Sequence, residues 1–255
     1  MDLGLQGRRI LVGGASRGLG AAIAEALAAE GARVAAVARP SDRLNATAER
    51  IGGIAIPADI SAVDAPAEIA VRALEALGGL DGLVVNSGGP PPGTFSQLDD
   101  ATWARAIQGT LMAAIRLIRA CLPALREGTN PAILIVLSSS VREPIPGLVT
   151  SNVLRPGLNG LVKSLVGEIA PIRINGIAPG RVDTDRIREL DQARASQTGD
   201  SVEHIQAEVR ARIPLGRYGQ PAEVGRVGAF LLSEAASYVN GVIVAVDGGM
   251  IRSLP

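Results

Sequence analysis

A glycine-rich turn near the start of the chain constrains the fold more than any other feature. The segment GGASRGLG at 13–20 follows the apolar run ILV at 10–12 and precedes AAIAEALAAEG, whose composition is typical of a helix. A strand, a glycine turn and a helix N-terminus together present free backbone N–H groups and a partial positive charge to phosphates. The pattern predicts a dinucleotide-binding site, and the alternative is a turn with a structural role only.

Each glycine of this turn has an expected task. Gly14 permits the tight turn, Gly18 lets the backbone approach a phosphate, and Gly20 lets the helix pack closely on the strand. The spacing is G-x-x-x-G-x-G rather than the G-x-G-x-x-G of the dinucleotide fingerprint. The other loop residues that we expect around the cofactor are Ser16, Arg17 and Leu19.

Short β-branched runs alternate along the chain with longer Ala- and Leu-rich stretches of helical period. The runs are apolar on both faces, as expected of parallel strands covered by helices on each side. We predict an α/β fold: a single doubly wound Rossmann-type domain over residues 1–255, with a seven-stranded parallel sheet flanked by helices. Strands are expected near 9–13, 33–37, 54–57, 82–86, 132–137, 172–177 and 241–246, and helices over 18–30, 42–51, 64–77, 99–126, 150–169 and 221–233.

The tract 185–213 departs from this alternation because it is polar and charged. It follows the sixth strand, where an open α/β sheet holds its ligand crevice. We interpret it either as a mobile lid over the site or as a solvated pair of helices.

Composition excludes several classes of function. The 255 residues have a formal net charge of zero, and the scattered cations, all but one of them Arg, form no nucleic-acid-binding stripe. Cys121 and His204 are each the only residue of their type, which argues against a disulfide, a cysteine or histidine metal site and a histidine-based triad. The N-terminus lacks the apolar core of a signal peptide, and no run has the length of a membrane span. We expect a cytoplasmic protein without a metal, nucleic-acid or membrane partner.

Further segments match one family in the expected order. They are Asp59 after the third strand, VVNSGG at 84–89, LSSS at 137–140, INGIAPG at 174–180 with Val182 and Thr184, PLGRYGQPAEV at 214–224 and VDGG at 246–249. With the glycine turn, they make the chain resemble the short-chain dehydrogenases/reductases, the 3-oxoacyl-carrier-protein-reductase-like members in particular, over nearly its whole length.

The resemblance implies roles for several residues. Asp59 would meet the adenine, Asn86 would lie near the adenine-side ribose, and the segment 179–184 would meet the nicotinamide amide. The cofactor contacts expected outside the glycine turn and the second strand are Asp59, Ile60, Asn86, Gly88, Pro179, Gly180, Val182 and Thr184.

The cofactor type follows from charge. A site for NAD usually has an acid about twenty residues after the glycines, whereas Arg39 stands nineteen residues after Gly20. A guanidinium there can bind a 2′-phosphate, and Arg17 can bind it from the other side. We interpret Asp42 as the cap of the next helix. These charges favour NADP(H), with NAD(H) as the second choice; the alternative is two ordinary surface arginines.

The catalytic positions are where the chain departs from the family it resembles. That family is expected to use an Asn, a Ser, and a Tyr followed four residues later by Lys. Counting from neighbouring anchors places the Asn at Thr110 and the Ser at Ser138, with Ser139 or Ser140 if the register slips. The Tyr-x-x-x-Lys segment falls on SNVLR, so Ser151 replaces Tyr and Arg155 replaces Lys.

These changes remove the usual proton relay. Ser151 has no phenol, and the guanidinium of Arg155 keeps its positive charge but cannot exchange protons as an amine does. Lys163 lies eight residues beyond Arg155, about 12 Å along a helix, which is too far to substitute. Pro156 is expected to kink the same helix. Tyr218 and Tyr238 stand in segments that look structural.

The loop SVREPIPGL at 140–148 offers one replacement. Glu143 could act as a general acid if it is desolvated, and Arg142 or Arg155 could stabilise an oxyanion. The alternative is an exposed ion pair between Arg142 and Glu143. The segment PPPG at 90–93 is expected to form a rigid turn, and His204 is expected at the surface.

Three functions remain open at this stage. The first is an NADP(H)-dependent oxidoreductase acting on a small carbonyl or alcohol substrate with a nonstandard proton donor. The second is a cofactor-binding protein without turnover, acting as a sensor or partner subunit. The third is a lyase resembling the halohydrin dehalogenases. For each we expect a homo-oligomer, a tetramer or dimer, with the helices 99–126 and 150–169 in the main contact.

Overall fold

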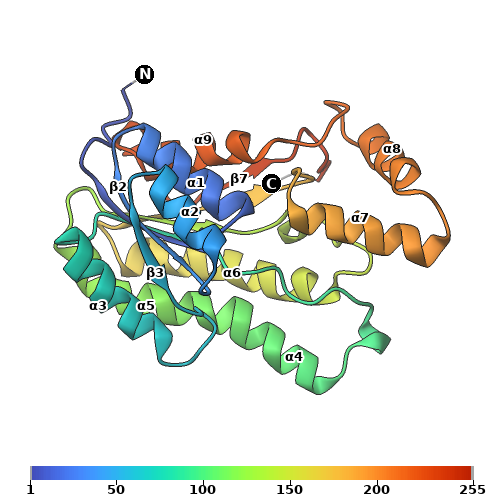
Figure 1. Cartoon of the computed structure of the whole chain (residues 1–255), viewed down its shortest axis with the longest axis horizontal. Helices are drawn as coiled ribbons and strands as arrows, with labels where there is room; N and C mark the ends of the chain where they lie inside the picture. Colours follow the sequence, from blue (N-terminus) through green and yellow to red (C-terminus); the bar gives the residue numbers. More distant parts are fainter. Residues whose placement is uncertain (1, 254–255) are drawn as a thin grey trace.

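A seven-stranded parallel sheet forms the centre of the computed structural model, which describes residues 2–253 (Figure 1). The strand order is β3-β2-β1-β4-β5-β6-β7, and every pairing is parallel. The predicted doubly wound fold is confirmed, and the strand ends differ from the predicted ones by at most two residues. The strands are β1 (Arg9–Gly13), β2 (Arg33–Ala38), β3 (Ile54–Pro57), β4 (Gly82–Val85), β5 (Ala132–Val136), β6 (Arg173–Pro179) and β7 (Ile243–Val246).

Helices cover both faces of the sheet because successive side chains of each strand point to opposite sides. In β1, Leu11 packs into the core beneath α3, α5 and α6, whereas Ile10 and Val12 pack into the core beneath α1, α2 and α9. The two helical layers lie below and above the sheet in Figure 1. The helices are α1 (Gly18–Ala29), α2 (Asp42–Arg50), α3 (Ala65–Leu77), α4 (Asp100–Ala106), α5 (Ala113–Arg126), α6 (Val149–Glu168), α7 (Asp185–Thr198), α8 (Val202–Arg212) and α9 (Pro221–Leu232).

The single helix predicted over 99–126 is interrupted. Between α4 and α5 the backbone forms a π-helical segment, Ile107–Met112, that carries the buried Thr110. A π-helical segment accommodates one extra residue in a turn, and such segments are frequent at functional sites. The 3.6-residue period of the side chains on either side gives no sign of it, so the sequence pattern predicts a continuous helix.

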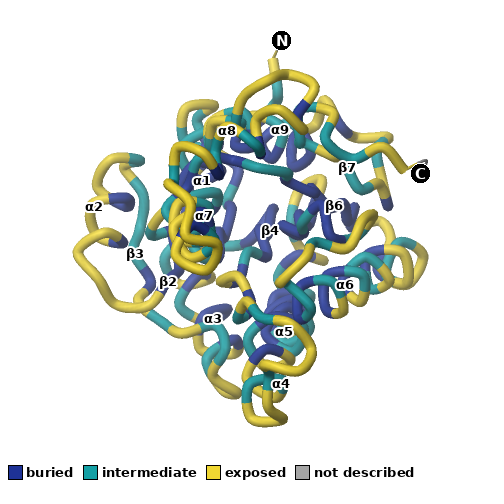
Figure 2. Tube along the Cα trace, turned by 90° about the vertical axis from the view of Figure 1, so that its right-hand side faces the viewer, coloured by how far each residue is buried: buried dark blue, intermediate teal, exposed yellow. Residues whose placement is uncertain are grey.

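The tract 185–213 folds as α7 and α8, joined at Gly199, whose φ of +78° is the left-handed conformation that ends many helices. Thr184 and Ser201 cap the two N-termini with their side chains. Most of both helices is exposed and lies beyond the carboxyl edge of the sheet (Figure 2). This part of the chain is therefore the predicted helix pair, and its movement as a lid stays a prediction.

Two local predictions concern α6 and α2, and the second was wrong. The helix α6 is continuous from Val149 to Glu168 although Pro156 lies inside it, and the kink expected at this proline stays a prediction. Ser41, rather than Asp42, caps α2, because its hydroxyl accepts a hydrogen bond from Leu44 N; Asp42 is the first residue of the helix. A serine in extended conformation directly before a helix is a favoured N-cap.

The amino end of the sheet is held by an ion pair. Arg9 Nε and Nη2 donate to Asp81 at 2.8 and 2.7 Å, and Thr129 N donates to the same carboxylate at 2.8 Å. Burial by itself would raise the pKa of Asp81, but the hydrogen bonds from Arg9 and Thr129 lower it to about 2. This contact links β1 to β4 at the end opposite the expected cofactor site.

The order of the strands explains where a ligand can bind. The chain leaves β1 toward β2 on one side, whereas β4 lies on the other side of β1. Loops that leave β1 and β4 in opposite directions open a crevice at the carboxyl edge of the sheet. Among residues 2–253, no helix has the length and hydropathy needed to cross a bilayer, and no group of three or more His, Cys, Asp or Glu side chains is arranged to hold a metal.

Candidate active site and cofactor crevice

The glycine turn after β1 requires its glycines. Gly14 has a φ of +60°, and a Cβ on it would lie 2.6 Å from the backbone oxygen of Asn86. A Cβ on Gly20 would overlap the carbonyl of Gly14, so only glycine lets α1 start this close to the strand. Gly18, in the turn, has a φ of +59°. Gly88, which follows β4 across the crevice, has a backbone that faces open space. The turn is therefore tight on the side of the sheet and open on the side of the crevice.

Asn86, directly after β4, supports this turn. Its side-chain amide donates to the carbonyl oxygens of Gly13 and Gly14 at 3.3 and 3.4 Å. The contact joins the ends of β1 and β4 across the crevice, because the two strands are neighbours in the sheet. In this structure the side chain holds the loop that would bind the cofactor.

The N-terminus of α1 is free to bind an anion. No side chain caps it, and its first turn contains no acidic residue. The first N–H groups of the helix therefore have no partner within the helix, and the helix dipole adds a partial positive charge. With a glycine at position 18, this arrangement fits the pyrophosphate of a dinucleotide.

The residues expected near the adenosine lie at the ends of β2 and β3. Arg39 is exposed directly after β2. Asp59 accepts hydrogen bonds from Ser61 Oγ at 2.7 Å and Ser61 N at 2.9 Å, next to the half-buried Ile60. The side-chain hydrogen bond from Ser61 lowers the pKa of Asp59 most strongly, and the positive charge of Arg39 lowers it further.

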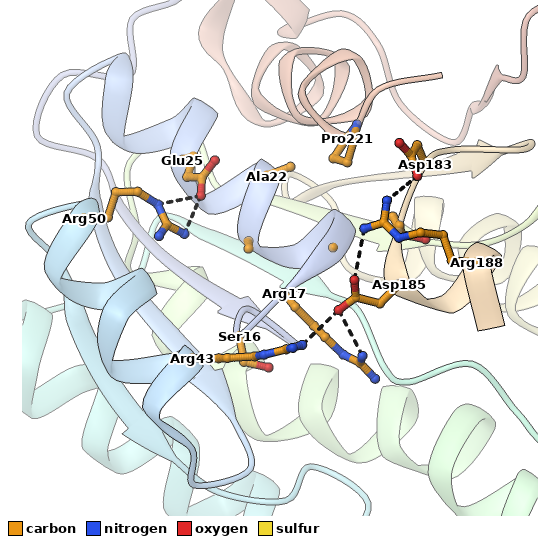
Figure 3. Close-up of a pocket in the computed structure, with 13 residues that line it drawn as sticks. Ser16, Arg17, Ala22, Glu25, Arg43, Arg50, Asp183, Asp185, Arg188 and Pro221 are labelled. Atoms are coloured by element: carbon orange, nitrogen blue, oxygen red, sulfur yellow. Dashed lines mark hydrogen bonds and ion pairs between the residues drawn. The ribbon is translucent and has the colours of Figure 1, made fainter. Parts of the chain in front are cut away.

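A cluster of charges lies between the glycine turn, α2 and α7 (Figure 3). Arg17 Nη1 and Arg43 Nη1 both donate to Asp185 Oδ2, at 3.2 and 2.9 Å. Arg188 Nη2 donates to the other oxygen, Oδ1, at 3.1 Å. These residues line an open cavity of about 380 Å³, together with Ser16, Gly18 and Thr184.

The segment after β6 forms the opposite wall of the crevice. Val182 pairs with Gly219, and Asp183 N donates to the oxygen of Gly219 at 2.8 Å. A Cβ on Gly180 would lie 2.6 Å from Cβ of Asp247, so this turn also needs glycine. These contacts hold the turn from Pro179 to Thr184 at the carboxyl edge of the sheet.

Three serines meet where β5 ends and α6 begins. Ser140 Oγ lies 3.0 Å from Ser151 Oγ, and both residues are buried. Ser138 Oγ accepts a hydrogen bond from Ser140 N at 3.2 Å, but Ser138 itself is only half-buried. The hydroxyl hydrogen of Ser138 therefore stays free to donate to a ligand. Of the Ser140 and Ser151 hydroxyls, one donates to the other, and Ser140 Oγ also lies within donating distance, 3.3 Å, of the Ser151 carbonyl oxygen.

Arg155 is a buried cation without a counter-ion among the described residues. It is 6% exposed, and its Nη1 donates to the oxygen of Val136 at 2.6 Å. Its Nε is buried without a hydrogen-bond partner. Burial lowers the pKa of Arg155 to about 10, because the charged form has lost its water. A buried charge of this kind is costly unless a ligand supplies its partner.

Two further candidate residues are Thr110 and Glu143, and the catalytic position expected for Thr110 stays a prediction. Thr110 is buried on the π-helical segment and makes no hydrogen bond to the serines or Arg155 within the described chain. Glu143 is exposed and makes no ion pair with Arg142 among residues 2–253; its Oε1 accepts from Arg252 N and Ser253 N at 3.0 and 3.1 Å. The predicted ion pair is therefore wrong, and the desolvation required of a general acid is absent.

The comparisons with known proteins agree with this geometry. A family model described as enoyl-(acyl carrier protein) reductase matches residues 14–251. The 3-oxoacyl-(acyl-carrier-protein) reductase FabG of Aquifex aeolicus is 31% identical over 258 residues, covering 98% of this chain and 100% of that protein. FabG of Escherichia coli is 32% identical over 253 residues, covering 97% and 99%. The chain belongs to the short-chain dehydrogenase/reductase family.

Solved structures of this family have the same fold over the whole chain. L-Sorbose reductase from Gluconobacter frateurii, complexed with NADPH and L-sorbose, has a TM-score of 0.93 and 30% identity, with 100% of both chains covered. A short-chain oxidoreductase from Pseudomonas aeruginosa, described as NADPH-bound and as containing an atypical catalytic center, has a TM-score of 0.87 and 31% identity, covering 98% and 99%.

Outside the crevice, the structure brings together residues of this short-chain dehydrogenase/reductase that sequence reasoning did not connect. Asp191 on α7 is buried and accepts from Arg181 Nη1 at 3.0 Å and from Tyr218 Oη at 2.8 Å. Burial and the hydrogen bond to Asp191 raise the pKa of Tyr218 to about 12. This phenol therefore holds α7 in place through its hydrogen bond to Asp191. His204 is exposed as expected, and Tyr238 is fully exposed.

Proposed function

We propose that the protein is an NADP(H)-dependent oxidoreductase that interconverts a small carbonyl compound and its alcohol. The observation that carries this proposal is the uncapped N-terminus of α1, which opens on a crevice beside the guanidinium of Arg17. Arg39 directly follows β2, the neighbour of β1 in the sheet. The NADPH-bound family members support the same cofactor. The site would lie within a single domain that assembles as a homo-oligomer in the cytoplasm.

The cofactor would lie along the carboxyl edge of the sheet. Ser16, Leu19 and the glycines of the turn would surround the pyrophosphate, and Arg17 with Arg39 would bind the 2′-phosphate through charge-assisted hydrogen bonds. Asp59, Ile60 and Gly88 would border the adenosine, and Pro179, Gly180, Val182 and Thr184 the nicotinamide. Asn86 would act by holding the turn, through its hydrogen bonds to Gly13 and Gly14.

In the chemical step, the bound cofactor supplies or accepts a hydride. Ser138 would donate its free hydroxyl hydrogen to the substrate oxygen and so stabilise the negative charge that develops there. Arg155 would bind the hydroxyls of the nicotinamide ribose and place a positive charge behind the reaction centre. Ser151 would act through Ser140, since the two hydroxyls are 3.0 Å apart. Thr110 would complete the wall of the pocket.

The proton of the alcohol must come from a group other than a Tyr–Lys pair. Among the described residues of the serine cluster, none is an acid of suitable strength, so the proposed source is a water molecule beside the half-buried Ser138, which would give a proton to the substrate oxygen and leave as hydroxide. A serine hydroxyl has no tendency to ionise near neutral pH, and Arg155 stays charged because its pKa is about 10.

A second function is favoured by one observation. The hydroxyl of Ser151 is buried and engaged with Ser140, which is an arrangement typical of a satisfied polar core. A protein with such a pair could bind NADP(H) without turnover, as a sensor or partner subunit. The two proposals share the cofactor site and differ only in whether a substrate is converted there.

Titration of the protein with NADPH and NADH, followed by cofactor fluorescence, tests the cofactor site. We expect tighter binding of NADPH, and in Arg39→Asp a loss of at least tenfold for NADPH with little change for NADH. Equal affinities for the two cofactors in the unmodified protein would refute the preference for NADP(H). Turnover of a panel of ketones and alcohols with the preferred cofactor then separates the enzyme from the non-catalytic binder.

A further inference from the structure

Asp185 occupies the centre of the charge cluster between the glycine turn, α2 and α7 (Figure 3). One of its oxygens accepts from both Arg17 and Arg43, and the other accepts from Arg188. Three cations from three different elements thus converge on a single carboxylate. Within residues 2–253, Arg43 has no other ion pair, and Arg17 has one other, a longer contact at 3.4 Å to Glu189.

The position of these arginines indicates what else could bind them. Arg17 belongs to the glycine turn, and Arg43 is the second residue of α2, four residues after Arg39 at the end of β2. The two guanidinium groups therefore meet at one point, the Oδ2 atom of Asp185, between the glycine turn and the start of α2. A 2′-phosphate carries about two negative charges and three acceptor oxygens, which suits such a pair better than a carboxylate does.

We propose that Asp185 is an internal competitor for the cofactor's 2′-phosphate and that Arg43 is a phosphate-binding residue beside Arg17. This inference rests on the proposed cofactor. In the cofactor-free protein Asp185 holds the two guanidinium groups together, and the arriving phosphate exchanges with it. The Asp185 carboxylate then retains its ion pair with Arg188, which lies three residues later on the same helix.

The exposure of the cluster makes this exchange easy. The side chains of Arg17, Arg43 and Asp185 are 49%, 64% and 37% exposed, and ion pairs at such exposure stabilise a protein little. A phosphate can therefore displace the carboxylate at a small cost in affinity. A buried ion pair at the same place would instead have blocked the cofactor.

The exchange would also release α7 from the glycine turn. Asp185 is the first residue of α7, and its contacts with Arg17 and Arg43 are the ion pairs that connect the start of this helix to the turn and to α2. The far part of α7 stays fixed, because Asp191 is bound by Arg181 and Tyr218. Only the first turn of α7 is therefore expected to loosen when NADP(H) binds.

The neighbouring Asp183 provides a matched control. It lines the same cavity, its side chain is 40% exposed, and its ion pair is with Arg188 and not with Arg17 or Arg43. Asp185→Asn and Asp183→Asn each remove one negative charge from the cavity. Only the first frees the two arginines of the proposed phosphate site.

The experiment measures binding by isothermal titration calorimetry with NADPH, NADH, 2′-AMP and 5′-AMP. We expect Asp185→Asn to bind NADPH and 2′-AMP about three- to tenfold more tightly than the unmodified protein, with NADH and 5′-AMP unchanged. Asp183→Asn should stay within about twofold for every ligand. Equal increases in affinity in the two variants would mean that the change in net charge alone explains the effect, and would overturn the proposal. An increase in affinity for 5′-AMP equal to that for 2′-AMP would overturn it as well.

Arg43→Gln tests the other half of the proposal without changing a residue of α7. It should weaken NADPH and 2′-AMP about three- to tenfold, and adding Asp185→Asn to it should give a smaller gain than in the unmodified background. Independent, multiplicative effects would show that the two residues do not compete at one site. Hydrogen exchange should rise at 187–189, and not near Asp191, when NADPH binds.

The outcomes separate this inference from the proposed function. If the unmodified protein binds NADPH no more tightly than NADH, and Arg39→Asp changes neither, the preference for NADP(H) itself is wrong. If NADPH is preferred and Arg39→Asp abolishes the preference, but Asp185→Asn behaves like Asp183→Asn, only the competition by Asp185 is refuted.

Discussion

The hydroxyl oxygens of Ser140 and Ser151 lie 3.0 Å apart at the junction of β5 and α6, and the sequence interpretation predicts that Ser151 replaces the family's tyrosine. The pair satisfies two buried hydroxyl groups that would otherwise cost free energy in the core. It also leaves Ser138 as the serine with a free and partly accessible hydroxyl. The local structure is therefore compatible with binding of a substrate oxygen but supplies no strong proton donor.

Restoring the Tyr–Lys pair should reveal what its loss costs. General acid catalysis contributes about 10²- to 10⁴-fold, so we expect slow or undetectable reduction of ketones and 3-oxoacyl substrates by the unmodified protein. The double variant Ser151→Tyr with Arg155→Lys should gain activity by a factor within that range. Steady-state rates with NADPH measure it.

The control for this experiment is Ser151→Phe with Arg155→Lys, which has nearly the same bulk at 151 but no phenol. Brisk turnover by the unmodified protein would mean that another proton donor exists. Glu143→Gln then decides whether that donor is Glu143, and we expect no effect because Glu143 is exposed and binds the backbone of Arg252 and Ser253.

Arg155 should contribute to the affinity for NADPH rather than to the free energy of unfolding. It is buried with one hydrogen bond, to Val136 O, and without a counter-ion within residues 2–253. We expect Arg155→Met to leave the free energy of unfolding unchanged or raise it by up to about 2 kcal/mol, because a buried unpaired charge is removed. The affinity for NADPH should fall at least tenfold. Urea unfolding and cofactor titration measure the two effects.

Arg173→Met is the matched comparison. Arg173 is also a buried arginine, but its guanidinium donates to the oxygens of Leu231 and Ser233 at 2.8 and 2.9 Å. Its removal leaves two carbonyl groups without these donors, so stability should fall by about 2 to 4 kcal/mol. A similar loss in Arg155→Met would contradict the functional role proposed for Arg155.

The fold was predictable because each strand is apolar on both faces. Ile10, Leu11 and Val12 alternate between the two cores, and the glycine turn that follows them identifies the first strand–helix unit of a doubly wound sheet. The π-helical segment was not predictable, since one extra residue within a turn leaves the apolar pattern of α4 and α5 intact. The apolar pattern placed the end of β6 and the start of β7 two residues too early: β6 continues to Pro179, whereas β7 begins only at Ile243.

The candidate site was predictable where it depends on backbone and not where it depends on long side chains. The glycine pattern indicated the turn at Gly14 and Gly20, and the family resemblance, counted from the fifth strand, indicated Ser138. It did not indicate that Arg43 meets Asp185, because these residues are 142 positions apart and meet only once α2 and α7 are placed on the sheet. The same holds for Tyr218 and Asp191, which join the segment 214–224 to α7.

The ion pair of Asp81 with Arg9 predicts how stability depends on pH. The folded pKa of Asp81 is about 2, whereas an unfolded aspartate has a pKa of about 3.9. Because the folded pKa is lowered, the stabilisation is fully present above about pH 4 and is lost as the pH falls toward 2. It amounts to about 2 kcal/mol. Asp81→Asn should remove this stabilisation at pH 7. In urea unfolding at a series of pH values, the free energy of unfolding of this variant should depend less on pH between about 4 and 2.

Asp200→Asn is the control for this series. Asp200 is exposed in the turn between α7 and α8, and its substitution should change the free energy of unfolding by less than about 0.5 kcal/mol. If both variants keep the same slope between pH 4 and pH 2, the contact between Asp81 and Arg9 does not set the acid stability.

The last prediction concerns assembly through α6. Val153, Gly157, Gly160 and Gly167 recur at helical spacing along one stripe of this helix, and Val153 is 55% exposed. A Cβ added to Gly160 or Gly167 would meet nothing within 4 Å, so the stripe is open to a second helix, and small residues let helix axes approach closely.

We expect a dimer or tetramer at micromolar concentration, and Val153→Glu should dissociate it. Val71→Glu on α3 changes a valine of equal exposure and should leave the assembly intact. Sedimentation velocity distinguishes these outcomes: a monomeric unmodified protein, or equal dissociation by both variants, would exclude α6 as the contact.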